Sequence, residues 1–481
     1  MVVEDRPDSQ PSNRLAANSV TFRHVMAQGF ISNAPLASVA VSLTTAAAFG
    51  LGALPLTYVL GAIMALVWIN TPFQFSKRIG SAGGLFSFIR AGLGEKWAFS
   101  AGIGYLAYYL LLVPANALTV SVLITTISSS LGYSLPGWIW FPIAVVVIIP
   151  SYVIAYFRLR PGLNYGVVTG IVEVVVLVVL SIIFIFHSGV TNTTHVYDPS
   201  IALHGFSGVL VGMAVASTGL GGPTAVVYLA EESHAPGRTI KRAMLTTQIV
   251  VVVLYLLVSY ALTVAWGPGK MGSFASSGVP GLILVDRYLG RGPELILAVL
   301  LINSIIGVDL AVNIGMARMI YHMSRIGLLP VKLQETHPKH KTPTPALLLS
   351  LIVELVFSII AGFVWGPING FIVMIVAATA GGLLSHILAN IALISYSARQ
   401  KIFKVVTRAV LPCVSIGFIG VAIYGNFFPV TYPAWVGAAI VLVAMITALV
   451  YAFGRRSPTL AEPDFTKAMG SDVVEEAELE P

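Results

Sequence analysis

The sequence predicts an all-α polytopic membrane protein with about twelve transmembrane helices. Hydrophobic residues make up 57% of the chain, charged residues make up only 10%, and the mean hydropathy is +0.88. Soluble proteins carry roughly 25% charged residues, so this composition excludes an ordinary soluble domain. About twelve apolar stretches divide the 481 residues. Each is long enough for the ~20 residues with which a helix crosses the hydrocarbon of a bilayer.

The cationic residues fall almost entirely on one side of these stretches. Successive gaps between the stretches must lie on alternate sides of a membrane, so the gaps fall into two sets. One set holds all but three of the 27 lysines and arginines, and the other holds Lys270, Arg287 and Arg291. Cationic loops are retained on the cytoplasmic side of a membrane. We therefore predict an even number of spans with both termini in the cytoplasm. This topology also accounts for the basic pI of 9.4, so no nucleic-acid partner is inferred.

The predicted spans follow the apolar stretches in order, each bounded by a polar or glycine- and proline-containing gap. They lie near residues 25–49, 53–76, 98–126, 138–157, 163–187, 206–231, 241–266, 293–321, 346–364, 368–396, 408–427 and 432–453.

The segments outside the spans are short. Residues 1–22 are polar and lack the apolar core of a cleavable signal peptide, so we predict a cytoplasmic tail and a first span that acts as its own insertion signal. Residues 23–400 are predicted to form a ten-helix core, residues 401–454 helices eleven and twelve, and residues 455–481 a cytoplasmic acidic tail. The single cysteine, Cys413, excludes disulfides within the chain.

Two of the spans carry helix-breaking sequences. In residues 31–38 of the first span, Pro35 has no amide proton, and Ser32 and Asn33 can bond the backbone groups that a break would free. Residues 217–224 of the sixth span contain three glycines and a proline. Open backbone at this depth is tolerated only where it lines a cavity or is buried in protein, so two breaks predict a site between these helices. The alternative is that they are kinks or close-packing positions, which are common in membrane helices.

The spacing of the breaks also predicts internal symmetry. They lie five spans apart, which matches inverted repeats that relate spans one to five to spans six to ten by a pseudo-two-fold axis. The repeats would cover roughly residues 23–190 and 205–400.

Four short stretches, spread over about 330 residues, carry a family resemblance. They are Ser32-Asn33-Ala34-Pro35-Leu36, Ser81-Ala82-Gly83-Gly84-Leu85-Phe86-Ser87-Phe88 with Gly92-Leu93-Gly94, Leu229-Ala230-Glu231-Glu232-Ser233-His234-Ala235-Pro236, and Ala317-Arg318-Met319-Ile320-Tyr321 through Ser324-Arg325-Ile326-Gly327-Leu328-Leu329-Pro330. In this order they resemble the amino acid–polyamine–organocation transporters, specifically the prokaryotic amino acid permeases. The resemblance implies a LeuT-type fold of ten core helices plus two, with a small amine-bearing substrate at the broken helices.

This resemblance places the expected substrate shell on the two breaks. The half-helix that follows the first break would direct free amide groups and a positive dipole end toward a substrate carboxylate, and carbonyl groups exposed at the second break would accept from an ammonium group. The expected shell is Ser32, Asn33, Ala34, Leu36, Ala37, Ser38, Thr218, Gly219, Leu220, Gly221 and Thr224. Relatives often place an aromatic gate and a Gly-Phe-Glu-like element in span six. This chain has Thr218, Leu220 and Gly222-Pro223-Thr224 there, which suggests a roomier pocket.

Acidic residues inside the spans are candidates for ion coupling. Glu173, Asp309 and Glu354 lie away from the loops, and a carboxylate at mid-bilayer costs at least ~2.5 kcal/mol when ionised. In the resembled family, the position of Glu173 carries a coupling lysine or a glutamate. Spans one, five and eight meet at the coupling site of that fold, so Glu173 and Asp309 are candidates to face each other and to share a proton. The alternative is that each is a neutral acid bonded to a neighbouring helix. Glu354 is interpreted as structural, because span nine is peripheral in the resembled fold.

Other polar residues carry weaker signals. Tyr105 and Tyr109 share a helix face and His386 lies in the tenth span, but packing is the commoner role for such groups. We recognise no metal-site spacing, and we expect no metal and no cofactor. Asn192-Thr193-Thr194 is a formal glycosylation acceptor on the outer side, although such triplets occur by chance. The sequence contains no phosphate-binding loop and no nucleophile triad, so we expect neither an ATP-driven pump nor an enzyme.

Together these observations predict a secondary active transporter of an amino acid or related amine. It would work by alternating access in the cytoplasmic membrane, with proton symport as the preferred coupling. Its partners would be the small-molecule substrate, the proton and membrane lipid. Substrate exchange and sodium-coupled symport remain alternatives within transport. A membrane sensor or channel that keeps the fold is the alternative of another class.

Overall fold

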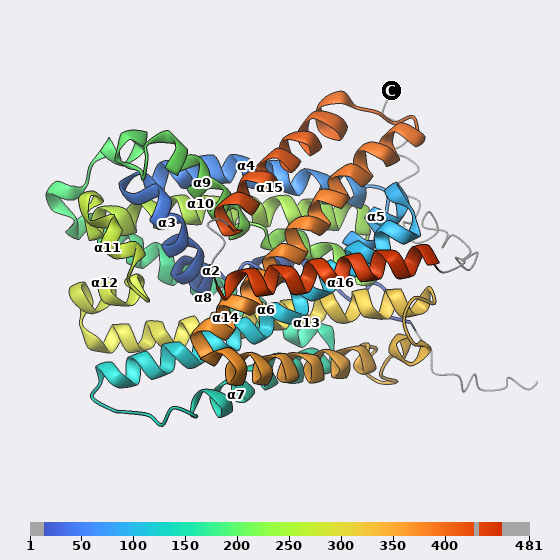
Figure 1. The fold of residues 1–481 in the computed structure, drawn as a ribbon, viewed down its shortest axis with the longest axis horizontal. Helices are drawn as coiled ribbons and strands as arrows, with labels where there is room; N and C mark the ends of the chain where they lie inside the picture. Colours follow the sequence, from blue (N-terminus) through green and yellow to red (C-terminus); the bar gives the residue numbers. More distant parts are fainter. Residues whose placement is uncertain (1–13, 428–431, 455–481) are drawn as a thin grey trace, which may run out of the picture.

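A computed structural model describes residues 14–427 and 432–454 of the protein, so most of the two predicted tails lies outside the described residues. Within those residues every regular element is a helix, apart from one isolated parallel β-bridge between Val20 and Ser233. Nine helical segments of the described chain are long and apolar enough to cross a membrane, and the 17-residue helix α7 is a shorter apolar one. Most of these helices run side by side along one axis of the molecule (Figure 1).

The helices of the first half of the chain begin near the predicted boundaries. They are α1 (Phe22–Ile31), α2 (Pro35–Ser38), a π-helical turn η1 (Val39–Leu43), α3 (Thr44–Gly50), a 3₁₀ turn (Leu51–Ala53), α4 (Leu54–Ser76), α5 (Leu85–Leu93), α6 (Glu95–Ser130), α7 (Trp140–Tyr156), α8 (Leu159–His187) and three 3₁₀ turns (Gly189–Thr191, Thr194–Tyr197 and Pro199–Ile201).

The second half of the chain is also built of helices and short helical turns. Its elements are α9 (Phe206–Thr218), the 3₁₀ helix η6 (Gly222–Glu232), α10 (Pro236–Trp266), a 3₁₀ turn (Pro268–Lys270), α11 (Met271–Ala275), α12 (Pro280–Leu289), α13 (Arg291–Arg325), a 3₁₀ turn (Val331–Gln334), α14 (Thr344–Arg399), a π-helical turn (Val406–Val410), α15 (Leu411–Phe427) and α16 (Ala434–Gly454).

The first predicted span is broken where the sequence indicates. Helix α1 ends at Ile31 and α2 begins at Pro35, and Ala34 between them has a left-handed backbone with φ of +41°. Pro35 has no amide group to continue the ladder of α1. The chain then runs through η1 and α3 to a turn at Leu51, where φ is again +41°, and α4 packs back against α3.

The second predicted break is also present. Helix α9 ends at Thr218, and the 3₁₀ helix η6 begins at Gly222 with Pro223 in its first turn. Residues 219–221 between them are glycine, leucine and glycine. The high glycine content weakens the helix at this point, and Pro223 removes one ladder donor.

Helix α14 is a folded-back pair of helices. Gly366 has φ of +76° and ψ of 164°, which is outside the helical region. A Cβ atom built on Gly370 would lie 2.7 Å from the carbonyl oxygen of Ala361. These two residues would be about 13 Å apart along a straight helix, so the chain reverses near Gly366, as the orange ribbon of Figure 1 shows. The two halves correspond to the predicted spans at 346–364 and 368–396.

Three short helices were not predicted as helices. Helix α5 lies at one end of the bundle, and α11 and α12 lie at the other (Figure 1). Apolar side chains of α12, including Leu282, Leu284 and Val285, are buried, and Pro280 suits the first turn of a helix. This outer connection, expected as a loop, therefore folds onto the bundle.

Two groups of helices surround the breaks. Helix α6 packs against both halves of α14 and against α7, α13 and α16, while α1 packs against α8, α10 and η6. Helix α13 contacts members of both groups, including α2, α6 and α8. The breaks therefore lie between these two groups of helices.

Candidate functional site

A cavity of about 390 Å³ lies between the two groups of helices. It extends from the two breaks along α3, α6 and the second half of α14. The residues that line it are Ser32, Asn33, Ala34, Ala37, Ser38, Val41, Ser42, Thr45, Trp68, Tyr105, Tyr108, Leu112, Asn116, Thr119, Val215, Thr218, Gly219, Gly221, Gly222, Thr224, Ile305, Val308, Phe371, Ile375, Val376, Thr379, Gly382, Leu383, His386 and Phe427.

The two broken helices touch at the floor of this cavity. A Cβ atom built on Gly222 would lie 2.6 Å from the backbone of Asn33, so only glycine allows this approach. Asn33 is further held by its side-chain amide, which donates to the hydroxyl of Tyr255 on α10 at 2.7 Å. The hydroxyl of Ser38 donates to the carbonyl oxygen of Asn33 at 2.6 Å and closes the loop of the first break.

The structure brings nine of the eleven predicted shell residues to the cavity. From the first break these are Ser32, Asn33, Ala34, Ala37 and Ser38, and from the second they are Thr218, Gly219, Gly221 and Thr224.

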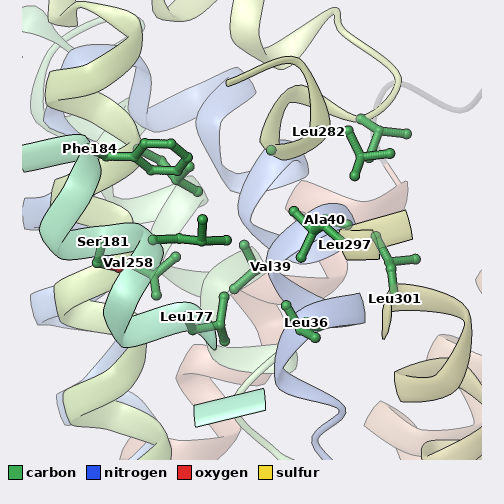
Figure 2. A pocket seen from close by; sticks show the side chains of 14 residues that line it. Leu36, Val39, Ala40, Leu177, Ser181, Phe184, Val258, Leu282, Leu297 and Leu301 are labelled. Atoms are coloured by element: carbon green, nitrogen blue, oxygen red, sulfur yellow. The ribbon is translucent and has the colours of Figure 1, made fainter. Parts of the chain in front are cut away.

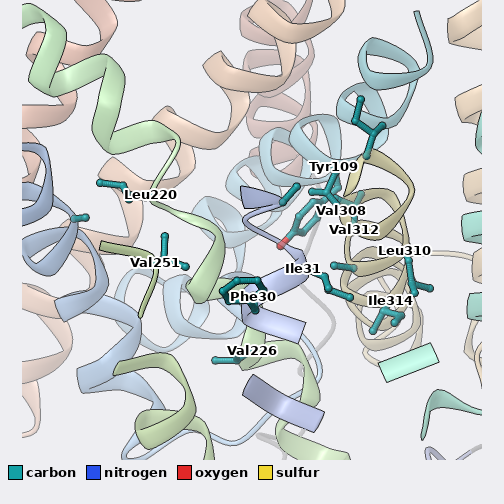
Figure 3. Packing of buried hydrophobic residues seen from close by; sticks show 14 of the residues in the cluster. Phe30, Ile31, Tyr109, Leu220, Val226, Val251, Val308, Leu310, Val312 and Ile314 are labelled. Atoms are coloured by element: carbon teal, nitrogen blue, oxygen red, sulfur yellow. The ribbon is translucent and has the colours of Figure 1, made fainter. Parts of the chain in front are cut away.

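Leu36 and Leu220 are not among the residues that line this cavity. Leu36 lies two residues, or about 200° around a helix, from Ser38, and it lines a small apolar pocket with Leu177, Leu297 and Leu301 (Figure 2). Leu220 is 1% exposed and belongs to the buried cluster drawn in Figure 3. At both breaks the apolar side chain turns into the protein while its neighbours face the cavity.

Glu173 lies on α8, and its carboxylate reaches the first turn of α2. Its carboxylate accepts from the backbone N–H of Leu36 at 3.1 Å and from the hydroxyl of Ser304 at 3.0 Å. The N–H of Ala37 donates to the same hydroxyl at 3.4 Å. The prediction of free amide groups facing a ligand is therefore wrong at these two positions, because a side-chain carboxylate of the protein already takes the positive end of the half-helix.

Asp309 has different partners from Glu173. Its carboxylate accepts from the side-chain amide of Asn116 on α6 at 2.7 Å. Asp309 lies five residues after Ser304 on α13, which is about 140° around the helix. Since Ser304 faces Glu173, Asp309 lies on a different face of α13, toward Asn116 of α6. The structure therefore does not pair the two carboxyl groups.

Several cavity residues were missed or given little weight in the sequence. The Trp68 ring packs against His386, with ring centroids 4.2 Å apart and the ring planes tilted by 44°, and the indole Nε1 of Trp68 has no hydrogen-bond partner. The side-chain oxygen of Asn33 is also unpartnered. Unpartnered polar atoms beside a cavity are candidates for contact with a ligand or water, and only the folded arrangement reveals them. Tyr105 lines the cavity, whereas Tyr109 is buried behind it.

The cavity wall combines aliphatic and aromatic side chains with hydroxyl and amide groups. None of the lining residues is an aspartate, glutamate, lysine or arginine. Apolar side chains come from several helices, among them Val41, Leu112, Ile305 and Leu383. Such a wall can hold an aliphatic group, while the hydroxyl and amide groups at the breaks fix its polar end.

The end of the bundle that carries α5 is closed by ion pairs. Glu232 at the end of η6 pairs with Arg318 of α13, and both side chains are almost fully buried. Glu231 pairs with Arg325 at 2.7 Å and accepts from the backbone N–H of Ala82 at 3.0 Å. Three of the four stretches that carry the family resemblance therefore meet at one closed end.

Acidic and imidazole side chains do not cluster as metal ligands in the part of the chain that the structure describes. No group of three or more His, Cys, Asp or Glu residues that could hold a metal ion occurs there.

Known proteins are similar to this chain in sequence over much of its length. A family model described as amino acid permease matches residues 24–459. The branched-chain amino acid permease of Bacillus subtilis is 27% identical over 302 residues, which cover 60% of this chain and 63% of that protein. Cationic amino acid transporter 5 of Arabidopsis thaliana is 27% identical over 335 residues, which cover 64% of this chain and 54% of that protein.

A third relative is matched more fully. The branched-chain amino acid permease of Lactococcus lactis is 24% identical over 389 residues, which cover 76% of this chain and 79% of that protein. The matches to the first two relatives span less than two thirds of their length. Because the family model covers residues 24–459 of the 481, the chain belongs to the amino acid permease family, whose members are multi-pass membrane transporters and not a class of enzymes.

Proposed function

We propose that this protein is a proton-coupled symporter of branched-chain or similar neutral aliphatic amino acids. The observation that carries the proposal is the cavity at the two breaks, whose wall offers apolar side chains and hydroxyl groups but no aspartate, glutamate, lysine or arginine. A cationic amino acid would need a carboxylate near its side chain, because an unpaired charge in such a site is costly. The substrates in the names of the two branched-chain permeases fit a cavity without charged side chains. The substrate in the name of the cationic amino acid transporter fits it less well.

The orphaned atoms of the wall match the two ends of an amino acid. The indole N–H of Trp68 is a donor without a partner, and it lies near Gly221 of the second break. The side-chain oxygen of Asn33 is an acceptor without a partner at the first break. A substrate carboxylate would accept from the indole, and its ammonium group would donate to Asn33. The hydroxyls of Ser38 and Thr218, which also line the cavity, supply further polar contacts.

Glu173 is the group that would couple transport to protons. Its carboxylate joins α2 to Ser304 of α13, so it bridges the broken helix and the neighbouring group of helices. Protonation would remove the negative charge from the N-terminus of α2 and weaken this bridge. A change in proton binding would therefore alter how the broken helix is held, which is the requirement for coupling.

We further propose twelve crossings, a LeuT-type repeat and cytoplasmic termini in the cell membrane. The reversals at Leu51 and Gly366 each divide one long helical segment, and α7 adds a shorter apolar helix. The two ends of the described chain also support an even number of crossings, because both lie at the end of the bundle that carries α5. Leu15 packs on Ala82 just before α5, and Phe453 packs on Trp97 just after it. The two breaks, five spans apart, support the repeat.

The proposal is tested by uptake into proteoliposomes. The purified full-length protein should accumulate labelled leucine, isoleucine and valine when the lumen is alkaline, and it should not accumulate lysine, arginine or putrescine. Liposomes without protein serve as the control. Accumulation of lysine instead of leucine would contradict the substrate class.

Other arms of the same assay separate the alternatives. A sodium gradient at equal pH distinguishes sodium coupling, and a requirement for preloaded amino acid distinguishes exchange. Ion current without stoichiometric uptake would identify a channel, and ligand binding without either would identify a sensor. Each of these results would overturn proton symport.

A further inference from the structure

A second group of buried acids lies apart from Glu173. Asp309 of α13 and Glu354 of the first half of α14 are both fully buried, and they lie near enough for an electrostatic interaction. Asn313, one helical turn after Asp309, also neighbours Glu354. The side-chain amide of Asn313 donates to Ser151 of α7 at 3.2 Å. This acid pair is enclosed by helices α6, α7, α13 and α14, which pack on one another.

The hydrogen-bond inventory of this acid pair lacks donors. Four oxygen atoms there accept no hydrogen bond of good geometry, namely Oδ2 of Asp309, Oδ1 of Asn313 and both carboxylate oxygens of Glu354, although the Asn313 side chain lies close to Glu354. All four are acceptors when the acids are ionised. Buried polar atoms normally have a hydrogen-bond partner. Asn313 is a neutral amide, so its Oδ1 needs a donor whether or not the two acids are ionised. The missing component is a hydrogen-bond donor or a cation.

No cation of the described chain supplies that component. Asn116 of α6, Ser151 of α7 and Asn313 of α13 are the polar neighbours that the surrounding helices contribute, and the two carboxyl groups are the titratable ones. Arg318, nine residues after Asp309, is bound to Glu232 at the closed end. Two ionised carboxylates buried without a counter-ion cost several kcal/mol each, and one proton converts an acceptor into a donor.

The acid pair has one route to the cavity. Asn116 is only partly buried and lines the cavity, and its side-chain amide donates to Asp309. A ligand that draws the Asn116 amide toward the cavity would remove the hydrogen bond that stabilises ionised Asp309. Occupancy of the cavity and protonation of the pair are therefore linked through this one side chain.

We propose that Asp309 and Glu354 form an exchangeable proton-binding site, separate from Glu173, which Asn116 connects to the substrate cavity. A proton on one carboxyl group would donate to the other carboxylate or to Oδ1 of Asn313, and it would satisfy the orphaned atoms. A metal cation would need more oxygen ligands than the four orphaned here, since hard divalent cations take six or more. This site does not depend on the proposed transport function.

Infrared spectroscopy tests the site directly. The full-length protein with Glu173→Gln is reconstituted in lipid, so that Glu173 contributes no signal, and spectra are recorded as the pH is stepped. We expect a C=O stretch of a protonated carboxylic acid that fades as the pH rises. The band should be lost in Asp309→Asn and in Glu354→Gln. It should persist in Glu294→Gln, a matched control on α13 whose acid pairs with Arg291.

Further variants test the connection to the cavity. In Asn116→Leu, Asp309 loses its hydrogen bond, so the band should fade at higher pH than in the parent. An unchanged midpoint would overturn the link through Asn116. A band that does not respond to pH would show fixed neutral acids, and a band displaced by sodium at constant pH would show a cation site. Both results would overturn the proposal, as would a band that survives both amide variants. Elution volume and melting temperature check that each variant is folded, and none of these readings requires uptake.

Discussion

At the scale of single residues, Glu173 is held between two opposing influences. It is 3% exposed, and burial in a low-dielectric site favours the neutral acid. Its bonds to the N–H of Leu36 and the hydroxyl of Ser304 favour the ionised form. Small movements of α2 would change the hydrogen bonds to Glu173 but would leave its burial nearly constant. The protonation of Glu173 is therefore sensitive to the position of the broken helix.

Replacing this acid tests its part in coupling. In Glu173→Gln the side chain stays neutral, so leucine should still bind and exchange, but a pH gradient should no longer concentrate it above equilibrium. Counterflow and gradient-driven uptake are compared in the same proteoliposomes. Glu294→Gln, in the first turn of α13, should retain accumulation. Full accumulation by Glu173→Gln would make the acid merely structural.

Trp68 offers a test of how the substrate carboxylate is held. Trp68→Phe keeps an aromatic ring against His386 but removes the unpartnered indole N–H. A hydrogen bond to a charged group contributes about 1.5–3 kcal/mol, so leucine affinity should fall about tenfold or more. Binding is measured by scintillation proximity with labelled leucine. Unchanged affinity would show that the indole does not contact the substrate.

Gly221 offers a test of cavity volume. A Cβ atom there would meet the carbonyl oxygen of Thr218 at 3.5 Å and the indole nitrogen of Trp68 at 3.7 Å, which are ordinary contacts. Gly221→Leu should therefore fold normally but fill the cavity and abolish leucine binding. Gly417→Leu on α15, where an added Cβ meets nothing within 4 Å, is the matched control. Normal leucine affinity in Gly221→Leu would argue against the site.

The sequence predicts the breaks better than it predicts the direction of individual side chains. Pro35 and the glycines at 219, 221 and 222 identify both breaks, because their effect on a helix is local. Leu36 and Leu220 were misplaced because a broken helix has no fixed angle per residue. Glu354 was interpreted as structural because span nine is peripheral in the resembled fold, and nothing in its own helix indicates that Asp309 lies near it. Such contacts depend on which helices become neighbours.

At the scale of elements, the ion pair of Glu232 and Arg318 joins η6 to α13 inside the closed end. Arg318 also donates to the carbonyl oxygen of Ile314 at 2.8 Å. Arg318→Met would leave Glu232 buried without a partner, which typically costs about 3–5 kcal/mol. We expect a clear fall in melting temperature, measured by fluorescence in detergent. The double variant Glu232→Gln with Arg318→Met should recover most of it. Equal melting of the single and double variants would show that the charge of Glu232 is not the cause.

Long apolar elements are predictable, and short amphipathic ones are less so. Every predicted span corresponds to helix in the described residues, since ~20 apolar residues have few other folds in a membrane. Helices α5, α11 and α12 were missed because nine, five and ten residues give too few turns for a clear pattern. They form only because the bundle offers apolar surface at its ends.

At the scale of the whole molecule, the distribution of charge predicts its orientation. The connection after α13 contains Lys332, and the connection between α11 and α12 contains Ser276; both are exposed. In a Cys413→Ala background, Ser276→Cys should react with an impermeant thiol reagent in intact cells. Lys332→Cys should react only after permeabilisation. The reverse pattern would place the termini outside.

The closed end also ties the two broken helices together. Val20, just before α1, donates its backbone N–H to the carbonyl oxygen of Glu232 at 3.0 Å, and it accepts from the N–H of His234. The side chain of the same Glu232 holds Arg318. Opening this end must therefore break a backbone pairing and a buried ion pair in one event. The consequence is kinetic: such a step carries a large activation enthalpy, and we expect it, and not substrate binding, to set the turnover rate.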